Sequence, residues 1–501
     1  MYPSLYINII NKIEERFPVD EWTIDGINIW PLIRINERHI FNDSIHLEIE
    51  SKISASKLKK GRSIHQKLIK PIFNHFAAKF FDCCSNDSFK GKKDILFVSN
   101  TNLRRILISR KWYDVFCDPL VDYLEIEEKK CLILERTPLN NYIYPRYRKS
   151  IYIQLLLERI SLKNKFSRHP KTVILLEKYD EVTNYIKREI PDFKLIDVNG
   201  LLKKYYLVRL YKNFFINIIN EVQPKIGFFV SFYGLVGMGF NWACREACIP
   251  SVDLQHGLQG DYHSAYSSWK KIPQKGYSLL PNIFWCWGDN EYATINKWNA
   301  LVKEFHYPIV GGNPFIEKWK NDKAIKAPYK STLERLLDTN IIKILITDQG
   351  IGLPAWFVKS ILNSSNDIKW YLRLHPRPKI PSLNDVITNT FGECENVEIE
   401  ETTKLPLFSL LDKIDLHITQ WSSTVIEALE FGVPSIIIHE FGEELFKKYI
   451  QTGDVSYVSN QKELFFEIMN LKKRIFKKQN YKQKSKRALQ ALVRNYLPGA
   501  V

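Results

Sequence analysis

A histidine on a short polar loop follows one of the apolar runs of the sequence. The run 249–254 is typical of a buried strand, and Gln255, His256 and Gly257 follow it directly. A histidine held on a loop at a strand end can act as a general base near neutral pH. The alternative is a histidine that only satisfies hydrogen bonds of its own loop. The first candidate site comprises His256 as the base and, as ligand contacts, Gln255, Gly257, Asp261 and His263.

A carboxylate ends a second apolar run. Asp348 follows the run 341–347 and precedes Gln349 and Gly350. Such a carboxylate can take up a proton, contact a ribose hydroxyl, or cap a helix or turn, and the last role is the commonest. Asp348 is therefore a candidate catalytic residue, with the cap as its alternative.

Two arginines flank a histidine after a third run. Arg373, His375 and Arg377 alternate with Leu374 and Pro376, and the prolines end the strand. Guanidinium forks match phosphate oxygens, so two arginines and an imidazole around one loop favour an anionic ligand. The alternative is a surface loop with one buried histidine.

Three hydroxyl residues open a helical pattern after a fourth run. Ser422, Ser423 and Thr424 follow the run 416–419 and Gln420. Hydroxyls here are good N-caps, and together with exposed backbone N–H groups and the helix dipole they also form an anion site. Glu427 lies one turn further on and can reach ribose or sugar hydroxyls.

Other motifs carry little chemistry. Gly234, Gly237 and Gly239 do not form a dinucleotide or phosphate-loop fingerprint. Cys244 and Cys248 lie one helical turn apart, without a second pair at zinc spacing, so core packing is their expected role. No nucleophile-elbow or metalloprotease motif is present. We therefore predict neither a metal site nor a bound cofactor.

The candidate residues follow elements that alternate regularly. Strand-like runs lie at 226–232, 249–254, 283–287 and 307–310, and again at 341–347, 370–374, 397–399, 416–419 and 435–439, with helical patterns between them. This alternation indicates parallel sheets covered by helices, whose strand ends bind ligands. We predict an α/β fold with two Rossmann-like doubly wound domains and an extra N-terminal segment. The expected boundaries are an appendage at 1–92, domains at 93–315 and 316–460, and a C-terminal helix with a basic tail at 461–501.

The charge is concentrated in two stretches. The chain has 501 residues, 72 Lys and Arg against 55 Asp and Glu, and a net charge of +17. Residues 51–81 hold eight Lys or Arg and residues 468–501 hold ten, with no acidic residue in either, so the remainder is nearly neutral. Such stretches can be solvated helix faces, or can bind anionic membranes or nucleic acid. Aromatic and aliphatic residues are interleaved in the first stretch and no nucleic-acid-binding motif is present, which favours the membrane.

One uncharged stretch has the length of a membrane span. Residues 226–244 carry no charge, but they include four glycines together with polar residues. A buried strand, a glycine-rich turn and the start of a helix explain this composition better. The eight cysteines show no framework of short spacings and no secretory leader is evident, so a reduced, cytoplasmic chain is expected.

The order of the four clusters resembles a family with the GT-B fold. A Gln-His-Gly loop, a Gly-Asn-Pro boundary, a His-Pro loop and a Gln-Trp-Ser-Ser-Thr helix start are similar to motifs of bacterial cell-surface polymer transferases. That group includes CDP-glycerol glycerophosphotransferases, polysialyltransferases and capsule Kdo transferases. The resemblance covers about residues 225–450.

The resemblance implies a role for each cluster. It makes His256 the base for the acceptor hydroxyl, and it places His375 and the hydroxyls of Ser422, Ser423 and Thr424 at the donor phosphate. Gln255 stands where the glycerophosphotransferases have Trp, and Trp421 and Glu427 also depart from them, which favours a sugar donor. Asp348-Gln349-Gly350 matches the acidic motif of bacterial sialyltransferases only in part.

We therefore expect a metal-independent glycosyltransferase. It would move a sugar from a nucleotide-sugar donor to a saccharide or lipid-linked glycan acceptor of the capsular or lipopolysaccharide type. Donor contacts would come from Arg373, Arg377, Gln420, Ser422, Ser423, Thr424 and Glu427. The enzyme would work at the inner face of the cytoplasmic membrane, held there by residues 51–81 and 468–501, without nucleic acid. The alternatives are a teichoic-acid-type glycerophosphotransferase, a nucleotide-sugar epimerase and a non-catalytic scaffold.

Overall fold

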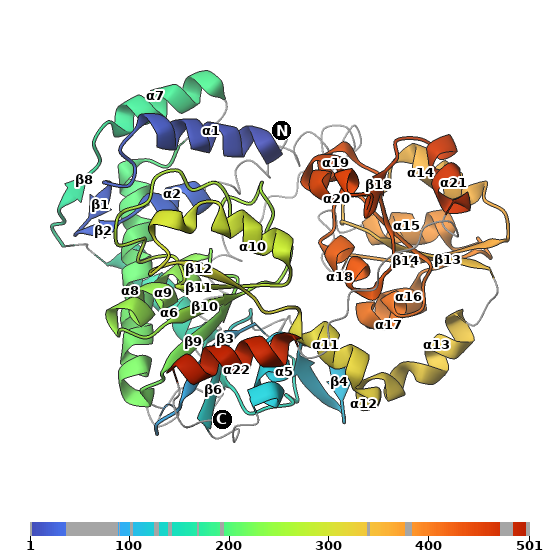
Figure 1. The fold of residues 1–501 in the computed structure, drawn as a ribbon, viewed down its shortest axis with the longest axis horizontal. Helices are drawn as coiled ribbons and strands as arrows, with labels where there is room; N and C mark the ends of the chain where they lie inside the picture. The colour runs from blue at the N-terminus through green and yellow to red at the C-terminus, as the bar shows by residue number, and fades with distance from the viewer. Residues whose placement is uncertain are drawn as a thin grey trace. The chain divides into compact units, whose positions relative to one another are not determined.

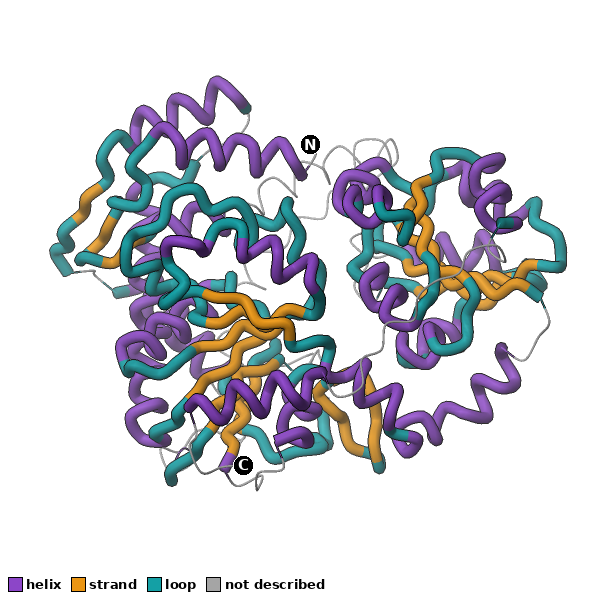
Figure 2. The backbone as a smooth tube through the Cα atoms, in the orientation of Figure 1, coloured by secondary structure: helices purple, strands orange, loops and turns teal. Residues whose placement is uncertain are grey.

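The described chain folds into two compact units. The computed structural model describes residues 3–36, 89, 91–100, 104–124, 130–138, 143–167, 170–190, 195–337, 341–375, 383–470 and 484–496. Unit 1 comprises the described residues up to Phe315 together with 484–496, and unit 2 comprises those from Ile316 to 470. Each unit has a parallel sheet with helices around it (Figures 1 and 2).

Unit 1 is built on a seven-stranded parallel sheet with the order β12-β11-β10-β9-β3-β6-β7. Its strands are β3 (Ile95–Ser99), β6 (Cys131–Glu135), β7 (Ile151–Tyr152), β9 (Ile226–Val230), β10 (Ser251–Leu254), β11 (Ile283–Cys286) and β12 (Tyr307–Val310). Successive strands add to one side of β3 and then, from β9 onward, to the other. This is the Rossmann order, and it places the topological switch point between β3 and β9.

Helices cover both faces of this sheet because its strands are apolar on both faces. They are α1 (Pro3–Arg16), α2 (Trp30–Asn36), α5 (Cys117–Leu124), α6 (Gln154–Phe166), α7 (Tyr179–Glu189), α8 (Val198–Val222), α9 (Leu235–Glu246), α10 (Asp289–Asn296) and α22 (Lys484–Tyr496), with a 3₁₀ turn at Asn299–Leu301. The long helix α8 begins where the Asp197 side chain accepts a hydrogen bond from the Gly200 N–H at 2.6 Å. Its buried face, with α9, packs on β3, β6 and β9.

The first 36 residues belong to the core of unit 1 and do not form a separate appendage. Helices α1 and α2 flank a hairpin of β1 (Thr23–Ile24) and β2 (Ile27–Asn28), which pairs with β8 (Ile174–Leu175). Trp22 and Trp30 are buried and lie edge to face at 5.7 Å. Their cluster continues into α7, α8 and the segment around Tyr266. The sequence does not reveal this because the packing partners are 150 to 240 residues away.

Unit 2 has a six-stranded parallel sheet with the order β15-β14-β13-β16-β17-β18. Its strands are β13 (Ile342–Thr347), β14 (Ile368–Arg373), β15 (Val397–Glu398), β16 (Leu416–Thr419), β17 (Ser435–Ile437) and β18 (Val455–Tyr457). This is again the Rossmann order, with the switch point between β13 and β16.

A separate hairpin of unit 1 is formed by β4 (Arg104–Ile108) and β5 (Lys111–Asp114).

The helices of unit 2 alternate with its strands. They are α12 (Lys323–Lys326), α13 (Lys330–Leu337), α14 (Ala355–Leu362), α15 (Leu383–Phe391), α16 (Glu400–Lys404), α17 (Leu407–Leu411), α18 (Thr424–Phe431), α19 (Glu440–Leu445), α20 (Lys447–Gln451) and α21 (Gln461–Met469), with a 3₁₀ turn at Ala327–Tyr329. Helix α11 (Pro314–Asn321) spans the junction of the two units. The α/β class with two Rossmann-like domains is confirmed.

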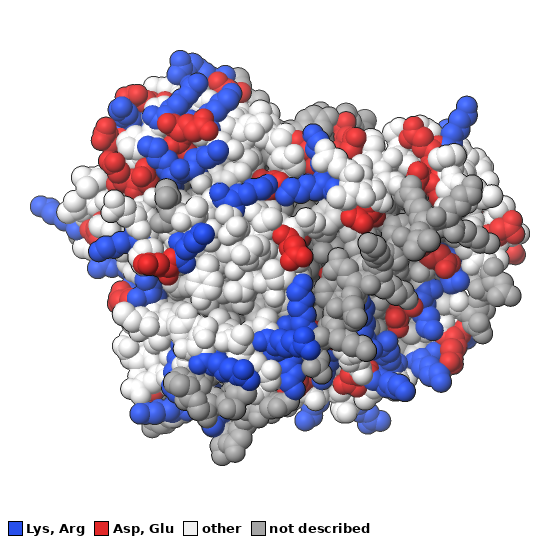
Figure 3. Space-filling view, viewed as in Figure 1, with Lys and Arg blue, Asp and Glu red and all other residues white. Residues whose placement is uncertain are grey.

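The C-terminal stretch divides between the units. Helix α21 belongs to unit 2, whereas α22 belongs to unit 1, where the Tyr307 and Tyr496 hydroxyls lie 3.1 Å apart. The predicted basic stretch 51–81 lies outside the described residues, as do 471–483 and 497–501 of the second. Over α1 and α7, basic and acidic side chains are interspersed (Figure 3).

The uncharged stretch 226–244 is a buried strand followed by a helix, as predicted. Strand β9 ends at Val230 and α9 begins at Leu235. Gly237, in the first turn of α9, is required because a Cβ atom there would lie 2.3 Å from the Phe232 carbonyl oxygen of the preceding turn. No helix among the described residues combines the length and the apolar character that crossing a membrane requires.

Candidate functional site

The first candidate site lies beside the switch point of unit 1. The chain leaving β9 carries Tyr233, and the chain leaving β10 carries His256. The Tyr233 hydroxyl and His256 Nε2 are 3.0 Å apart and hydrogen-bonded. The ring of His263 lies 5.2 Å from that of Tyr233 and 4.7 Å from that of Tyr266. Two histidines and two tyrosines therefore meet at the carboxyl edge of the sheet, where open α/β sheets bind ligands.

A buried carboxylate supports this cluster from within the sheet. Asp253, in β10, is fully buried and accepts hydrogen bonds from the Tyr266 hydroxyl at 2.9 Å and the Phe232 N–H at 3.0 Å. Phe232 follows Ser231, whose φ of 68° lies in the left-handed region. Asp253 thus fixes the turn that presents Tyr233. Burial raises the pKa of Asp253 to about 7, although these hydrogen bonds oppose the rise.

Asp253 is expected to make stability depend on pH. Its pKa rises from 3.8 to about 7 on folding, so the folded state holds the proton more tightly and the free energy of unfolding falls as pH rises across that interval. The free energy of unfolding falls by about 4 kcal/mol in all over this interval, and this contribution no longer changes above pH 7. Urea unfolding of wild type and Asp253→Asn from pH 4 to 8 measures it: the variant lacks this slope, and Asp412→Asn, a partly exposed control, retains it. Parallel slopes for wild type and Asp253→Asn would contradict the assignment.

The other predicted residues of this cluster hold the loop. Gln255 is buried and bridges strand ends, since its Oε1 accepts from the Trp287 N–H at 2.6 Å and its Nε2 donates to the Gly257 carbonyl at 2.8 Å. Asp261 contacts α10 through the Thr294 hydroxyl, at 3.1 Å, and Lys297. These contacts explain why His256 is followed by a defined loop.

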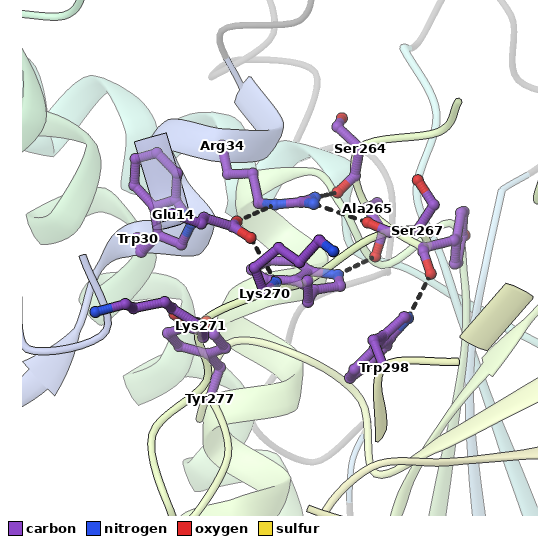
Figure 4. A network of polar contacts seen from close by, with 12 residues as sticks. Glu14, Trp30, Arg34, Ser264, Ala265, Ser267, Lys270, Lys271, Tyr277 and Trp298 are labelled. Carbon is purple, nitrogen blue, oxygen red and sulfur yellow. Dashed lines mark hydrogen bonds and ion pairs between the residues drawn. The ribbon is translucent and has the colours of Figure 1, made fainter. Parts of the chain in front are cut away.

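The N-terminal segment clamps the same loop. Arg34 of α2 donates from Nε to Glu14 Oε1 at 2.7 Å and from Nη2 to the Ser267 carbonyl at 2.7 Å, and it also bonds the Ser264 carbonyl. Both side chains of the pair are fully buried. Figure 4 shows the guanidinium between the carboxylate and the backbone of the loop. The residues that follow His256 are thus fixed by an ion pair from the start of the chain.

The second candidate site lies at the switch point of unit 2. Asp348 follows β13, and one of its oxygens accepts from the Gly350 N–H at 2.8 Å, as expected of a turn cap. Its other oxygen is buried and makes no hydrogen bond. Burial raises the pKa of Asp348, while backbone hydrogen bonds from Gly350 and His375 and the charge of His375 lower it. The structure thus brings two of the candidate catalytic residues, Asp348 and His375, together.

The predicted hydroxyl cluster opens α18 beside Asp348. Gln420 follows β16, is 2% exposed and donates to the Gly352 carbonyl at 2.8 Å. The Ser422 hydroxyl accepts from the Thr424 N–H at 3.2 Å and therefore caps the helix. Ser423 is the N-cap residue by position, yet its hydroxyl makes no capping bond. Glu427 lies in the first turn of α18.

One of the two predicted arginines contacts the main chain. Arg373 Nη1 donates to the Thr402 carbonyl at 2.8 Å and also bonds the Leu405 carbonyl. The guanidinium therefore satisfies carbonyls near the end of α16, which a helix leaves without partners. Arg377 lies outside the described residues.

Metal ligands do not gather in the described part of the chain: there, no group of three or more His, Cys, Asp and Glu is placed to hold an ion. Cys244 is buried on α9 and burial raises the pKa of its thiol, whereas Cys248 is exposed.

Comparison with known proteins gives a likeness of fold. No protein-family model and no curated protein matches the sequence. Among solved structures, UDP-GlcNAc 2-epimerase from Neisseria meningitidis bound to UDP-GlcNAc is similar with a TM-score of 0.50 and 14% identity, over 80% of this chain and 100% of that chain. The Methanocaldococcus jannaschii UDP-GlcNAc 2-epimerase in complex with UDP-GlcNAc and UDP has a TM-score of 0.46 at 10% identity (80% and 99% covered). The wall teichoic acid polymerase TagF has a TM-score of 0.41 at 11% identity (87% and 93% covered).

These findings define the fold of the protein. The two Rossmann-ordered sheets and the likeness to the Neisseria meningitidis structure assign the chain to the GT-B fold.

Proposed function

We propose that this protein is a glycosyltransferase that moves a sugar from a nucleotide-sugar donor to a glycan acceptor. The proposal rests on the side chains that lie at the switch points of the two sheets. Unit 1 presents a histidine hydrogen-bonded to a tyrosine, which suits a general base, and unit 2 presents hydroxyls at a helix N-terminus, which suit a phosphate. The similar epimerase structure is described as bound to UDP-GlcNAc, which supports a nucleotide sugar as the ligand.

The roles follow from the chemistry of sugar transfer. When His256 Nε2–H donates to the Tyr233 oxygen, the lone pair lies on Nδ1. Nδ1 is a buried atom, so the acceptor hydroxyl must enter the site and reach this atom to give up its proton. The acceptor oxygen attacks the anomeric carbon while the bond to the nucleotide phosphate breaks. Ser422, Ser423, Thr424 and the N-terminus of α18 stabilise the departing phosphate, and His375 donates a further hydrogen bond to it.

The acceptor in this proposal is a capsular or lipopolysaccharide-type glycan. It is built at the inner face of the cytoplasmic membrane, and the basic stretches 51–81 and 468–501 hold the enzyme near a lipid-linked acceptor. This part of the proposal is supported by the sequence alone.

The donor site is tested by nucleotide binding. Thermal-shift titrations with CMP, CDP, UDP and GDP are expected to raise the melting temperature with one of them, because a ligand of the native state stabilises it. Ser423→Ala is expected to weaken that nucleotide about tenfold without changing the melting temperature of the free protein, since Ser423 makes no capping bond. Ser422→Ala is the matched comparison: it also costs about 1 kcal/mol of stability, because it removes a cap.

Three outcomes would contradict the proposal. A chain that binds none of the four nucleotides favours the scaffold. Conversion of a nucleotide sugar without any acceptor favours an epimerase. Transfer only from CDP-glycerol favours a glycerophosphotransferase.

A further inference from the structure

One arginine beside the first candidate site has no partner of opposite charge in the part of the chain that the structure describes. Arg136 follows β6 directly, and its backbone N–H donates to the Ser99 carbonyl at the end of β3, at 2.9 Å. The residue is partly buried. Its guanidinium carbon lies 5.1 Å from the centre of the Phe229 ring of β9. The side chain therefore extends along the carboxyl edge of the sheet, from β6 toward the switch point.

The surroundings of Arg136 offer aromatic rings and hydroxyls. Burial lowers the pKa of Arg136, whereas electrostatic interactions with Tyr211 and Tyr233 raise it. Among the described residues, its side chain has neither a hydrogen bond nor an ion pair with a carboxylate. The segments that follow β3, β6 and β9, residues 100–103, 137–142 and 231–239, contain no Asp or Glu.

An arginine without an anionic partner at the carboxyl edge of the sheet indicates a binding site for an anion. Its guanidinium stays protonated in proteins, and burying it without an anion is costly. Arg245 of the same unit shows the contrast. It also lies over a phenylalanine ring, that of Phe305 at 5.0 Å, and burial also lowers its pKa, but it donates to the Lys275 carbonyl. Arg245 thus has one protein acceptor, although its Nη1 is buried without a hydrogen-bond partner, and the Arg136 side chain has no acceptor among the described residues.

The position of Arg136 indicates which ligand it serves. Tyr233, one of the two tyrosines that act on Arg136, is hydrogen-bonded to His256, the proposed base for the acceptor. We propose that Arg136 binds an anionic group, a carboxylate or a phosphate, carried by the glycan acceptor that reaches His256. This inference rests on the proposed function for the identity of the acceptor, but the anion site itself does not.

The test uses three sugars of one ring type and two arginine variants. Binding of glucuronate, glucose 6-phosphate and glucose to the full-length protein is measured by thermal shift and calorimetry at constant ionic strength. Wild type is expected to bind an anionic sugar and not glucose. Arg136→Met is expected to lose about tenfold or more in affinity while melting no lower than wild type, because it removes an unpaired charge. Arg245→Met is the control and is expected to melt lower but to keep the anion affinity.

The anionic sugars distinguish carboxylate from phosphate, and the other outcomes decide the proposal. It is overturned when wild type binds neither anionic sugar, when glucose binds equally well, when Arg136→Met keeps the affinity, or when that variant melts as low as Arg245→Met. A nucleotide shift that persists in Arg136→Met supports the acceptor as the anion carrier, and its loss overturns that assignment in favour of the donor. Anion binding in a protein that binds no nucleotide leaves the site standing and contradicts the proposed function alone.

Discussion

Replacing His256 by alanine is expected to lower kcat for sugar transfer by about 10²- to 10⁴-fold, with little change in the melting temperature. The imidazole is partly exposed at the edge of the sheet and is hydrogen-bonded to the Tyr233 hydroxyl, whereas the loop is held by Gln255 and by Arg34. Its removal therefore takes away the proton acceptor and leaves the scaffold in place. The assay uses the nucleotide sugar whose nucleotide gives the largest thermal shift.

Tyr233→Phe provides the graded comparison for this result. It keeps the ring that contacts His263 and removes only the hydroxyl that orients His256. We expect about a tenfold loss of kcat, with the imidazole still present to act as base. Full activity of His256→Ala would show that this histidine takes no part in the mechanism. A loss of activity accompanied by a marked fall in the melting temperature would show instead that His256 supports the fold.

The fold was largely predictable because its strands are short apolar runs between polar segments. The runs 307–310 and 416–419 coincide with β12 and β16. Between residues 100 and 222 the sequence pattern does not indicate the order of the elements, and β6 lies in this part of the chain. Its five residues become a strand through pairing with β3, a partner more than thirty residues earlier in the chain. Local pattern cannot supply such a partner.

The candidate sites were predictable only where chemistry coincides with a strand end. His256 and the hydroxyls Ser422 and Ser423 come within a few residues of the ends of apolar runs, and the fold places both groups at carboxyl edges. Asp253 and Arg136 give no such signal. The first stands inside an apolar strand, where a lone buried acid is the only hint, and the second is one arginine among many.

Arg373 shows that one sequence pattern is compatible with two kinds of acceptor for a guanidinium group. Its position next to a His-Pro loop favoured a phosphate contact, yet the guanidinium bonds the carbonyls of Thr402 and Leu405. Carbonyls near the end of a short helix need donors just as an anion does. Which of the two an arginine serves depends on α16, which lies about thirty residues further along the chain.

Arg34→Met is expected to lower the free energy of unfolding by about 3–5 kcal/mol, because it leaves Glu14 buried and unpaired. Besides the ion pair, the variant loses the bonds to two loop carbonyls and the contact of the guanidinium with the Trp269 ring at 4.1 Å. Urea unfolding measures the loss. Arg209→Met is the matched control, since its ion pair with Asp25 is partly exposed, and a change below about 1 kcal/mol is expected.

The double variant Glu14→Met/Arg34→Met separates the charge effect from the lost hydrogen bonds. With both charges absent there is no unpaired buried ion, so the double variant should be more stable than Arg34→Met alone. It should not reach wild type, because the N–H groups of Trp30 and Lys270 lose the carboxylate that accepts them at 2.7 and 2.6 Å. Faster hydrogen exchange in both variants at residues 264–270 would show that the clamp orders the loop after His256. A double variant as unstable as the single one would mean that these hydrogen bonds, and not the charge, account for the stability of the clamp.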